Sequence, residues 1–285
     1  MLNKNIKSPV NIPVSKINPF EGNPYKVLDN EEMNTLIGSI QEQCILTPII
    51  IRPIVSTDEY EVISGHRRLH ATVKAGLETV PAFIYAVNRD EAAIMLVDSN
   101  LHREHILPSE KAFAYKLKLE AIKRQGERTD LTSRQVVGKL ESEDLVSDTE
   151  SGRQVQRYIR LTYLIPELLD LVDEEKIALT PAVELSYLNE VEQADLVEEI
   201  RVCDATPNLS QAQRLRAISR EAGLTPEHIG EILAEEKANQ REKIKIPAER
   251  IRKYFPKSYT TEQIEEAIIK ICESRYRARQ GRDAR

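Results

Sequence analysis

The stretch EYEVISGHRRLHATVKAG, residues 59–76, decides the fold of the first part of this 285-residue chain. Its first half alternates like a β-strand, and its second half has the apolar spacing of an α-helix. Between them lies Gly65, followed at once by His66, Arg67 and Arg68. A helix N-terminus offers unpaired N–H groups, a glycine lets the backbone approach an anion, and arginines bind phosphate oxygens in pairs. The junction therefore predicts a phosphate-binding site, and the competing interpretation is a glycine turn with solvated arginines.

A second polar segment, DSNLHREHILPSEKA at residues 98–112, provides further candidates for the same site. Asn100 and Arg103 are three residues apart, so we expect them on one helix face just before Pro108. An amide oxygen can join the coordination shell of a metal ion, and an arginine can hold a phosphate. The segment predicts either a part of the phosphate site or an ordinary polar helix face.

The surrounding sequence predicts an α/β domain followed by helices. Four segments are expected to form strands: residues 10–17, 47–55, 60–64 and 80–87. Residues 29–43 are expected to form a helix with Asn30 as its N-cap. From about Asp90 onward the apolar spacing is helical throughout. The fold class is therefore α+β, with an N-terminal α/β domain, an all-α domain and a small helical C-terminal unit.

The segment SGRQVQRYIRLTYL, residues 151–164, has a polar and an apolar face when drawn as a helix. Four residues lie on its polar face: Arg153, Gln156, Arg157 and Arg160. Arginine and glutamine read guanine and adenine edges in the major groove, so this face predicts a DNA-recognition helix. A helix at residues 133–140 would complete a helix-turn-helix motif, and an ordinary amphipathic surface helix is the alternative. The long acidic turn between them, residues 141–150, is expected to point away from DNA.

Charge is distributed unevenly along the chain, whose net charge is −6. Residues 165–205 contain twelve acidic and two basic residues, whereas residues 241–285 contain thirteen basic and seven acidic ones. Because DNA responds to local patches of charge, the acidic total does not exclude a nucleic-acid partner.

The composition also predicts a compartment. The three cysteines, Cys44, Cys203 and Cys272, are far apart in the sequence, which indicates a reducing environment without a disulfide framework. The sequence shows no secretory leader and no apolar run of the roughly 18 residues that cross a bilayer. We therefore expect a cytosolic protein without a membrane partner.

Four segments resemble, in order, conserved boxes of the ParB family. ISGHRRLHA at residues 63–71 resembles the G-E-R-R-x-R-A box, and SNLHREHILPSEKA at 99–112 resembles the E-N-x-Q-R-x-x-L-x-P-x-E-x-A box. LIGSIQEQCILTPIIIRP at 36–53 resembles the L-x-x-S-I-x-x-x-G-x-x-x-P-I segment, and INPFEGNPYK at 17–26 resembles the I-x-P-N-P-x-Q-P-R-K segment. The resemblance covers residues 12 to about 115.

The resemblance implies a sulfiredoxin-like nucleotide-binding domain at residues 1–105 and a helix-turn-helix domain at 106–205. A charged helical linker is expected at 206–245, and a C-terminal unit for dimerisation or docking at 246–285. The resemblance further implies a CTP-gated dimeric clamp that binds CTP with Mg²⁺. The clamp would load at a centromere-like site on double-stranded DNA in the nucleoid and serve chromosome or plasmid partition with a ParA-type ATPase. Carried over position by position, the nucleotide-binding set is Ser39, Gly65, His66, Arg67, Arg68, Asn100 and Arg103, with Asn100 also on the family's metal-binding asparagine.

The chain departs from the family boxes at five positions. His66 and Ser99 replace acidic residues, Asn23 replaces the glutamine associated with hydrolysis, Tyr25 replaces an arginine, and Cys44 replaces a glycine. Two carboxylates are thereby lost, and carboxylates are the side chains that Mg²⁺ favours. We therefore expect phosphate binding to be kept, and CTP hydrolysis and metal affinity to be weak.

Three alternatives remain open at this point. A transcriptional regulator or nucleoid-occlusion factor of the Noc type would share the scaffold, and so would a nucleotide hydrolase or phosphotransferase. The four histidines at positions 66, 70, 102 and 105 could instead hold zinc. The C-terminal unit has an apolar stripe at Ile264, Ile268, Ile271 and Cys272 that predicts dimerisation or docking. Its basic tail either adds DNA affinity or is a disordered charged tail.

Overall fold

The structure, a computed structural model, describes residues 8–101, 105–130, 146–147 and 150–235, together with residue 103 and some positions between 251 and 271. The chain divides into two compact units, residues 1–235 and residues 236–285. In the described part of the chain, no helix is both long and apolar enough to cross a membrane.

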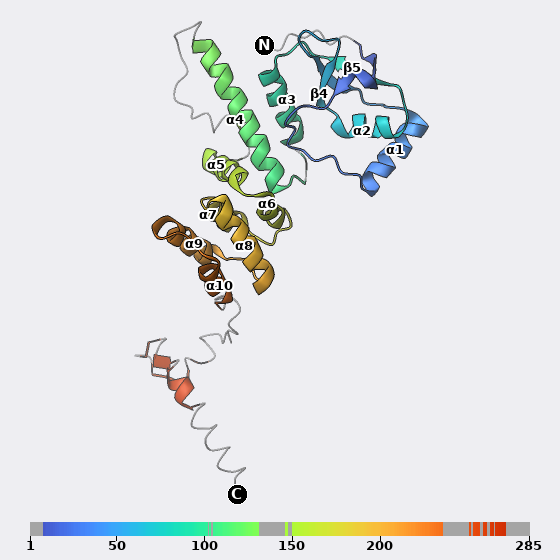
Figure 1. The fold of residues 1–285 in the computed structure, drawn as a ribbon. Coiled ribbons are helices and arrows are strands. Elements are labelled where there is room, and N and C mark those ends of the chain that lie inside the picture. Colours follow the sequence, from blue (N-terminus) through green and yellow to red (C-terminus); the bar gives the residue numbers. More distant parts are fainter. Residues whose placement is uncertain are drawn as a thin grey trace. The chain divides into compact units, whose positions relative to one another are not determined.

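A five-stranded mixed sheet forms the centre of the α/β domain, with the strand order β1–β5–β3–β4–β2 (Figure 1). The β1–β5 and β3–β4 pairs are antiparallel, and the β3–β5 and β2–β4 pairs are parallel. The strand predicted at residues 10–17 is split, because Pro13 ends β1 and a short 3₁₀ turn, Val14–Lys16, precedes β2. The strands are β1 (Val10–Pro13), β2 (Ile17–Asn18), β3 (Ile49–Pro53), β4 (Tyr60–Ser64) and β5 (Thr79–Ile84).

Helices cover both faces of this sheet. Neighbouring residues of β4 point to opposite faces, as in any strand. Val62 packs in a cluster with Leu69 of α2, whereas Ile63 packs in a cluster with Leu96 of α3. The Asn30 side chain accepts a hydrogen bond from the Met33 amide at 3.0 Å, which confirms the predicted N-cap of α1. The three helices are α1 (Glu31–Gln43), α2 (His66–Lys74) and α3 (Arg89–Leu101).

The long helix α4 (Pro108–Asp130) packs along α3. Two ion pairs join these helices: Lys118 Nζ lies 2.6 Å from a carboxylate oxygen of Asp98, and Arg124 Nε lies 2.8 Å from Asp90. These ion pairs hold together the two helices that contain most of the second polar segment, residues 98–112.

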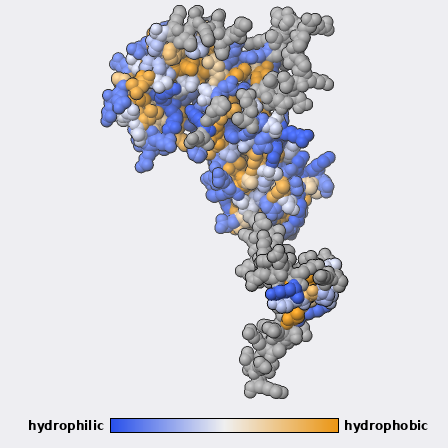
Figure 2. Space-filling model, turned by 180° about the vertical axis from the view of Figure 1, so that it is seen from behind, coloured by the Kyte–Doolittle hydropathy of each residue, from blue (hydrophilic) through white to orange (hydrophobic). Residues whose placement is uncertain are grey.

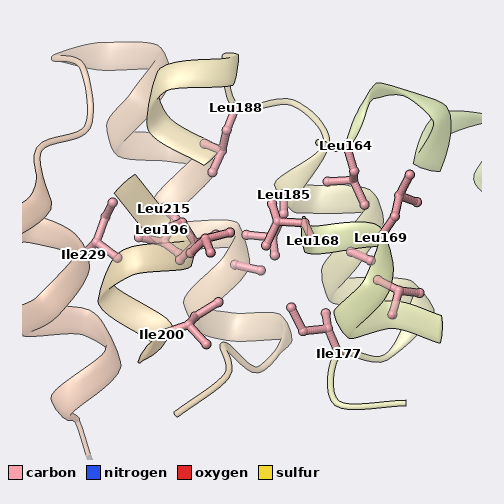
Figure 3. Close-up of a cluster of buried hydrophobic side chains, with 14 of the residues drawn as sticks. Leu164, Leu168, Leu169, Ile177, Leu185, Leu188, Leu196, Ile200, Leu215 and Ile229 are labelled. Carbon is pink, nitrogen blue, oxygen red and sulfur yellow. The ribbon is translucent and has the colours of Figure 1, made fainter. Parts of the chain in front are cut away.

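The helical region that follows has its own hydrophobic core, shown in Figure 3. Leu168, Leu185, Leu196, Leu215 and Ile229 are almost fully buried there and come from five different helices. Capping boxes begin two of the helices, one at Asn189 and one at Asn208. The elements are α5 (Gly152–Arg160), a 3₁₀ turn η2 (Leu161–Tyr163), α6 (Pro166–Asp173), α7 (Leu179–Leu185), α8 (Glu190–Cys203), α9 (Leu209–Glu221) and α10 (Pro226–Ala234).

The structure corrects the predicted linker at residues 206–245. Helices α9 and α10 fill much of that range and belong to the helical core, where Leu215 and Ile229 are fully buried. The Gln211 side chain, itself buried, donates to the Ile232 carbonyl at 2.6 Å and fixes the two helices together. The charged residues made this segment resemble a linker, but they alternate with apolar residues at helical spacing.

Some large apolar side chains remain exposed. Within the first unit they include Leu46, Val55 and Val202. Figure 2 shows hydrophobic residues interspersed among hydrophilic ones on the face that it draws. Scattered exposed apolar residues are normal in soluble folds and indicate no binding site by themselves. In the second unit Ile269 and Ile271 are exposed, and the assignment of residues 246–285 to dimerisation or docking stays a prediction.

Candidate nucleotide site and DNA-recognition helix

Gly65 is the N-cap of α2 and has a left-handed backbone conformation, with φ of 101°. A Cβ at this position would lie 2.8 Å from Cγ2 of Ile49 and 3.1 Å from Nη2 of Arg68, so a larger residue does not fit. Its carbonyl accepts a hydrogen bond from the Leu69 amide at 2.9 Å, the first of the helix. The strand–glycine–helix junction predicted from the sequence is therefore confirmed, and its amides are presented beside the two arginines.

The two arginines of the junction have partners within the protein. Arg68 donates to the carbonyls of Thr47 and Pro48, and burial lowers the pKa of its guanidinium. Arg67 pairs with Glu32 of α1 at 3.0 Å, and 40% of its side chain is exposed. Arg68 thus fixes the loop before β3, whereas Arg67 is held by a surface ion pair that an anionic ligand could replace.

Two buried polar atoms lie close to a third arginine. His66 Nε2 and the Tyr25 hydroxyl are both buried and have no hydrogen-bond partner among the described residues. The Arg103 guanidinium lies 5.6 Å from the centre of the Tyr25 ring, and its charge also acts on His66. Burial first, and then Arg103, lowers the pKa of His66 to about 4, so its imidazole is neutral at pH 7. Buried polar groups are nearly always paired, so this cluster has the character of a ligand site.

The proposed metal position carries an amide side chain and no carboxylate. Asn100 is buried, and its Nδ2 donates to the Leu96 carbonyl at 2.7 Å and to Ser99 Oγ at 3.3 Å. The carboxylate of Asp98 is engaged by Lys118. In the part of the chain that the structure describes, no group of three or more His, Cys, Asp or Glu side chains could hold a metal ion. Asn100 thus offers a metal ion an amide oxygen and no carboxylate, the side-chain group that Mg²⁺ usually binds.

The structure does not support the histidine cluster either. His70 lies 2.8 Å from the exposed Asp29 rather than beside His66 Nε2, and position 102 is outside the described residues. The remaining member of the predicted nucleotide set, Ser39, is exposed on α1. Among the described residues the zinc alternative has no ligand set, and the nucleotide-binding assignment stays a prediction.

Sequence reasoning missed a connection between this site and α4. The Lys26 amide, next to Tyr25, donates to Glu110 at 2.9 Å, and the second carboxylate oxygen of Glu110 accepts from the Leu107 amide at 3.3 Å. From the sequence alone, Glu110 could be placed only as an acidic residue in the first turn of a helix. No local sequence pattern predicts its hydrogen bond to a loop 84 residues earlier in the chain.

The helix α5 has the two faces that the sequence predicts. The Ser151 side chain caps it by accepting from the Gln154 amide. Val155 is fully buried, and Tyr158 packs edge to face on Tyr115 of α4 with ring centres 5.8 Å apart. On the other face Arg153 and Gln156 are exposed. The predicted partner helix at 133–140 lies outside the described residues, so the helix-turn-helix motif stays a prediction.

Part of the acidic turn before α5 packs against the protein. Val146 is fully buried in a cluster with Val155, and Glu150 pairs with Lys111 of α4 at 2.9 Å. The described end of the turn therefore faces α4, while residues 141–145 lie outside the described range.

Two of the four predicted DNA-contacting residues make internal contacts. Arg157 donates from one Nη atom to Thr180 Oγ1 at 2.5 Å and from the other to Gln154 Oε1 at 3.3 Å, so each Nη keeps a second N–H. Arg160 donates to the hydroxyl and the carbonyl of Ser186 at 3.1 and 3.0 Å, and its guanidinium stacks on two tyrosine rings. We therefore remove Arg160 from the base-contacting set, because bonds and stacking hold it to the end of α7.

The comparisons with known proteins agree with the sequence resemblance. The family model of the ParB N-terminal domain matches residues 2–101. The chromosome-partitioning protein Spo0J of Thermus thermophilus is 31% identical over 210 residues, which are 73% of this chain and 70% of that protein. The chain belongs to the ParB family.

The chain is also similar to a nucleoid occlusion protein and to solved ParB structures. A nucleoid occlusion protein of Listeria innocua is 24% identical over 207 residues, 70% of this chain and 71% of that protein. Two solved structures of C-terminally truncated ParB from Caulobacter crescentus are complexed to the centromeric parS site and with CTP-gamma-S, respectively. They are 20% and 22% identical, cover 75% and 68% of this chain and 100% and 99% of theirs, and have TM-scores of 0.42 and 0.32.

This ParB chain departs from the family boxes at the residues that carry two buried, unpartnered atoms. Both unpartnered atoms belong to residues that replace a charged residue of a family box. His66 replaces an acidic residue, and Tyr25 replaces an arginine. One negative and one positive charge are lost together, so the exchange leaves the sum of charges at these two positions unchanged. The arginines and the glycine of the boxes are kept.

Proposed function

We propose that this ParB protein is a CTP-gated dimeric clamp for partition DNA, with a nucleotide site at Gly65 and a DNA-reading face on α5. The observation that carries the proposal is the cluster of two buried, unpartnered polar atoms, His66 Nε2 and the Tyr25 hydroxyl, beside Arg103. A nucleotide would supply hydrogen-bonding groups to both atoms and negative charge to the arginines.

Each residue of the site has a separate role in this proposal. The first amides of α2 point toward the phosphates, and Gly65 lets the backbone come close to them. Arg103 binds a phosphate directly, and Arg67 exchanges its pair with Glu32 for one with the ligand. Arg68, already bonded to two carbonyls, holds the loop before β3 in place.

We expect little or no CTP hydrolysis. Asn23 donates its side-chain Nδ2 to the Tyr25 carbonyl at 3.2 Å and accepts from the Tyr25 amide, so it stabilises the loop instead of orienting a water molecule. His66 and Ser99 offer no carboxylate to a metal ion. The arrangement suits a nucleotide-binding switch better than a hydrolase or a phosphotransferase.

Nucleotide binding would reach the helical region through the contacts of the loop that contains Tyr25 and Lys26, which we call the Tyr25 loop. The loop binds Glu110 at the start of α4, and the neighbouring Ser109 is bonded to Asp173 of α6. A nucleotide that reorients Tyr25 would therefore move a loop tied to the helical region. This path is a physical connection between the pocket and α5, because α4 packs against α5.

The DNA part of the proposal rests on α5 and on family membership. Arg153, Gln156 and Arg157 are the residues that we expect to contact bases of a centromere-like site. The homodimer, the ParA-type ATPase partner and the nucleoid location follow from the family and from no contact in this structure.

Isothermal titration with CTP, UTP, ATP and GTP tests the nucleotide site. We expect CTP to bind wild-type protein, in magnesium or in EDTA, and Arg103→Ala to lose that binding. Arg89→Ala is the matched control, because Arg89 is also an exposed arginine close to an aromatic ring, with its guanidinium carbon 5.9 Å from the centre of the Phe20 ring. Absence of CTP binding at millimolar concentration, or equal binding by Arg103→Ala, would refute the proposal.

A nucleoid-occlusion regulator is the second candidate, because a nucleoid occlusion protein matches over 70% of this chain. The two candidates share the nucleotide and DNA sites and differ in their partner. A pull-down with the ParA-type ATPase of the same genome separates them: stable capture indicates partition, and its absence indicates the regulator.

A further inference from the structure

Cations and tyrosines alternate on the surface beside the C-terminal end of α5. The guanidinium carbon of Arg160 lies 4.5 Å from the ring centre of Tyr163 and 3.9 Å from that of Tyr187. The guanidinium carbon of Arg216 lies 3.5 Å from the same Tyr187 ring, and Lys116 Nζ lies 5.7 Å from the Tyr163 ring. We call these five residues the cation–tyrosine ladder.

The ladder joins four parts of the helical region. Lys116 belongs to α4, Arg160 and Tyr163 to α5 and η2, Tyr187 follows α7, and Arg216 belongs to α9. Two guanidinium groups less than 4 Å from one ring centre cannot share a face, so Arg160 and Arg216 sandwich the Tyr187 ring. The stacking fixes the orientation of side chains that would otherwise be mobile on a surface.

Internal packing explains only part of this arrangement. It explains the bonds from Arg160 to Ser186, but Tyr163 is 57% exposed and Tyr187 is 45% exposed. A guanidinium stacked on a ring keeps N–H groups directed sideways, where they can bind an oxyanion. The ladder therefore presents rigid tyrosine and arginine groups to an external partner.

The charge of the ladder indicates an anionic partner. Glu184 pairs with Arg216 at 2.7 Å, which leaves two of the three positive charges of the ladder uncompensated by that contact. None of these cations comes from residues 165–205, where twelve acidic and two basic residues give the helical region an acidic character. Arg153 and Arg160 are seven residues apart on one helix face, roughly 10 Å along the axis, so the ladder continues the face proposed to contact bases.

We propose that the cation–tyrosine ladder is a contact surface for the phosphate backbone of duplex DNA, beside the base-contacting face of α5. The inference rests on the proposed DNA-binding function and assigns phosphate contacts outside the recognition helix. Arginine, lysine and tyrosine side chains are regular donors to phosphate oxygens, and such contacts set the register of a protein on the duplex without reading sequence.

A salt titration with a mixed-sequence, fluorescently labelled duplex tests the ladder and needs no knowledge of the specific site. The double variant Arg216→Gln/Glu184→Gln removes one ladder cation with its partner and leaves the net charge of the protein unchanged. We expect several-fold weaker binding at about 0.1 M salt, and a slope of log affinity against log salt that is smaller by about 0.9, the value for one phosphate contact. Circular dichroism verifies that the variant is folded.

The matched control is Arg201→Gln/Glu198→Gln on α8, a surface pair at 2.6 Å outside the ladder. It makes the same change in charge and should leave affinity and slope as in wild type. Tyr187→Phe keeps the ring between the two arginines and removes only the hydroxyl donor, so it should reduce affinity about twofold without altering the salt slope.

Three results would overturn the proposal that the ladder contacts DNA phosphates. Equal slopes and affinities for the ladder variant and its control would do so. A loss limited to a specific duplex, with mixed-sequence binding intact, would make the ladder a support for α5 instead. Failure of wild-type protein to bind any duplex would remove the proposed DNA function as well, and the control variant would then fail equally.

Discussion

Asp173, at the end of α6, caps the first turn of α4 through Ser109. Its carboxylate accepts the Ser109 amide at 2.9 Å and the Ser109 hydroxyl at 2.5 Å, and both side chains are nearly buried. Glu110, the next residue, binds the Lys26 amide of the Tyr25 loop. One turn of α4 thus holds the loop at Tyr25 and Lys26 on one side and α6 of the helical core on the other, through bonds to charged acceptors.

Replacing Asp173 by alanine should destabilise the first unit by about 1–3 kcal/mol, because it leaves the buried Ser109 donors unsatisfied. Urea unfolding followed by far-UV circular dichroism measures the loss. Asp170→Ala is the control, because Asp170 is exposed on the same helix, and it should change stability by less than about 0.5 kcal/mol. Similar effects of the two variants would contradict the capping role.

Gly65→Ala should abolish CTP binding and destabilise the α/β domain. The left-handed backbone costs a non-glycine residue about 1–2 kcal/mol, and the new Cβ would also meet Ile49 at 2.8 Å. Gly76 supplies the control: its φ is 75°, but a Cβ there has nothing within 4 Å. Gly76→Ala should therefore show the backbone penalty alone and retain nucleotide binding by titration calorimetry. If Gly65→Ala bound CTP like wild type, close approach of the backbone at Gly65 would not be needed.

The local features of the α/β domain could be predicted from the sequence. The strand–glycine–helix junction at Gly65 and the cap at Asn30 depend on residues a few positions apart, and both are present in the structure. The amphipathic faces of α5 are likewise periodic, and Val155 is buried as expected.

Features that depend on distant residues could not be predicted. The sequence predicted base contact by Arg160, because helical periodicity cannot show that Ser186 and Tyr187 lie beside it. The packing of α9 was hidden for the same reason, since its charges face outward while Leu215 is buried. The lack of partners for His66 Nε2 and the Tyr25 hydroxyl depends on their burial, which a pattern of residue types does not reveal.

The stability of the protein should fall as the pH is lowered from about 6.5 toward 4. Burial lowers the pKa of His66 to about 4 in the folded state, whereas an unfolded histidine titrates near 6.5. Between these values the unfolded state binds the extra proton, so the contribution is complete above 6.5 and is lost at up to about 1.4 kcal/mol per pH unit below it. Urea midpoints measured from pH 7.5 to 5 follow this loss.

His66→Gln should flatten that pH dependence, because glutamine does not titrate. His70→Gln is the control, since His70 is the next histidine on α2 and pairs with the exposed Asp29. It should leave the wild-type slope in place. A wild-type slope that persists in His66→Gln would assign the pH dependence to another group.

Arg157→Ala should weaken binding to the specific DNA site far more than binding to random duplex. Arg157 lies on the exposed side of α5, and bonds to Thr180 and Gln154 fix its guanidinium in one position. Each Nη atom keeps a second N–H that can donate to a base. A bidentate contact to a base is worth about 1–3 kcal/mol of discrimination, so specific affinity should fall by roughly 5- to 150-fold. Arg201→Ala on α8 is the control for a lost surface arginine, and fluorescence anisotropy with site-containing and scrambled duplexes measures all three proteins. Equal losses on both duplexes would show that Arg157 contacts phosphate rather than a base, and would leave Arg153 and Gln156 as the residues to test next.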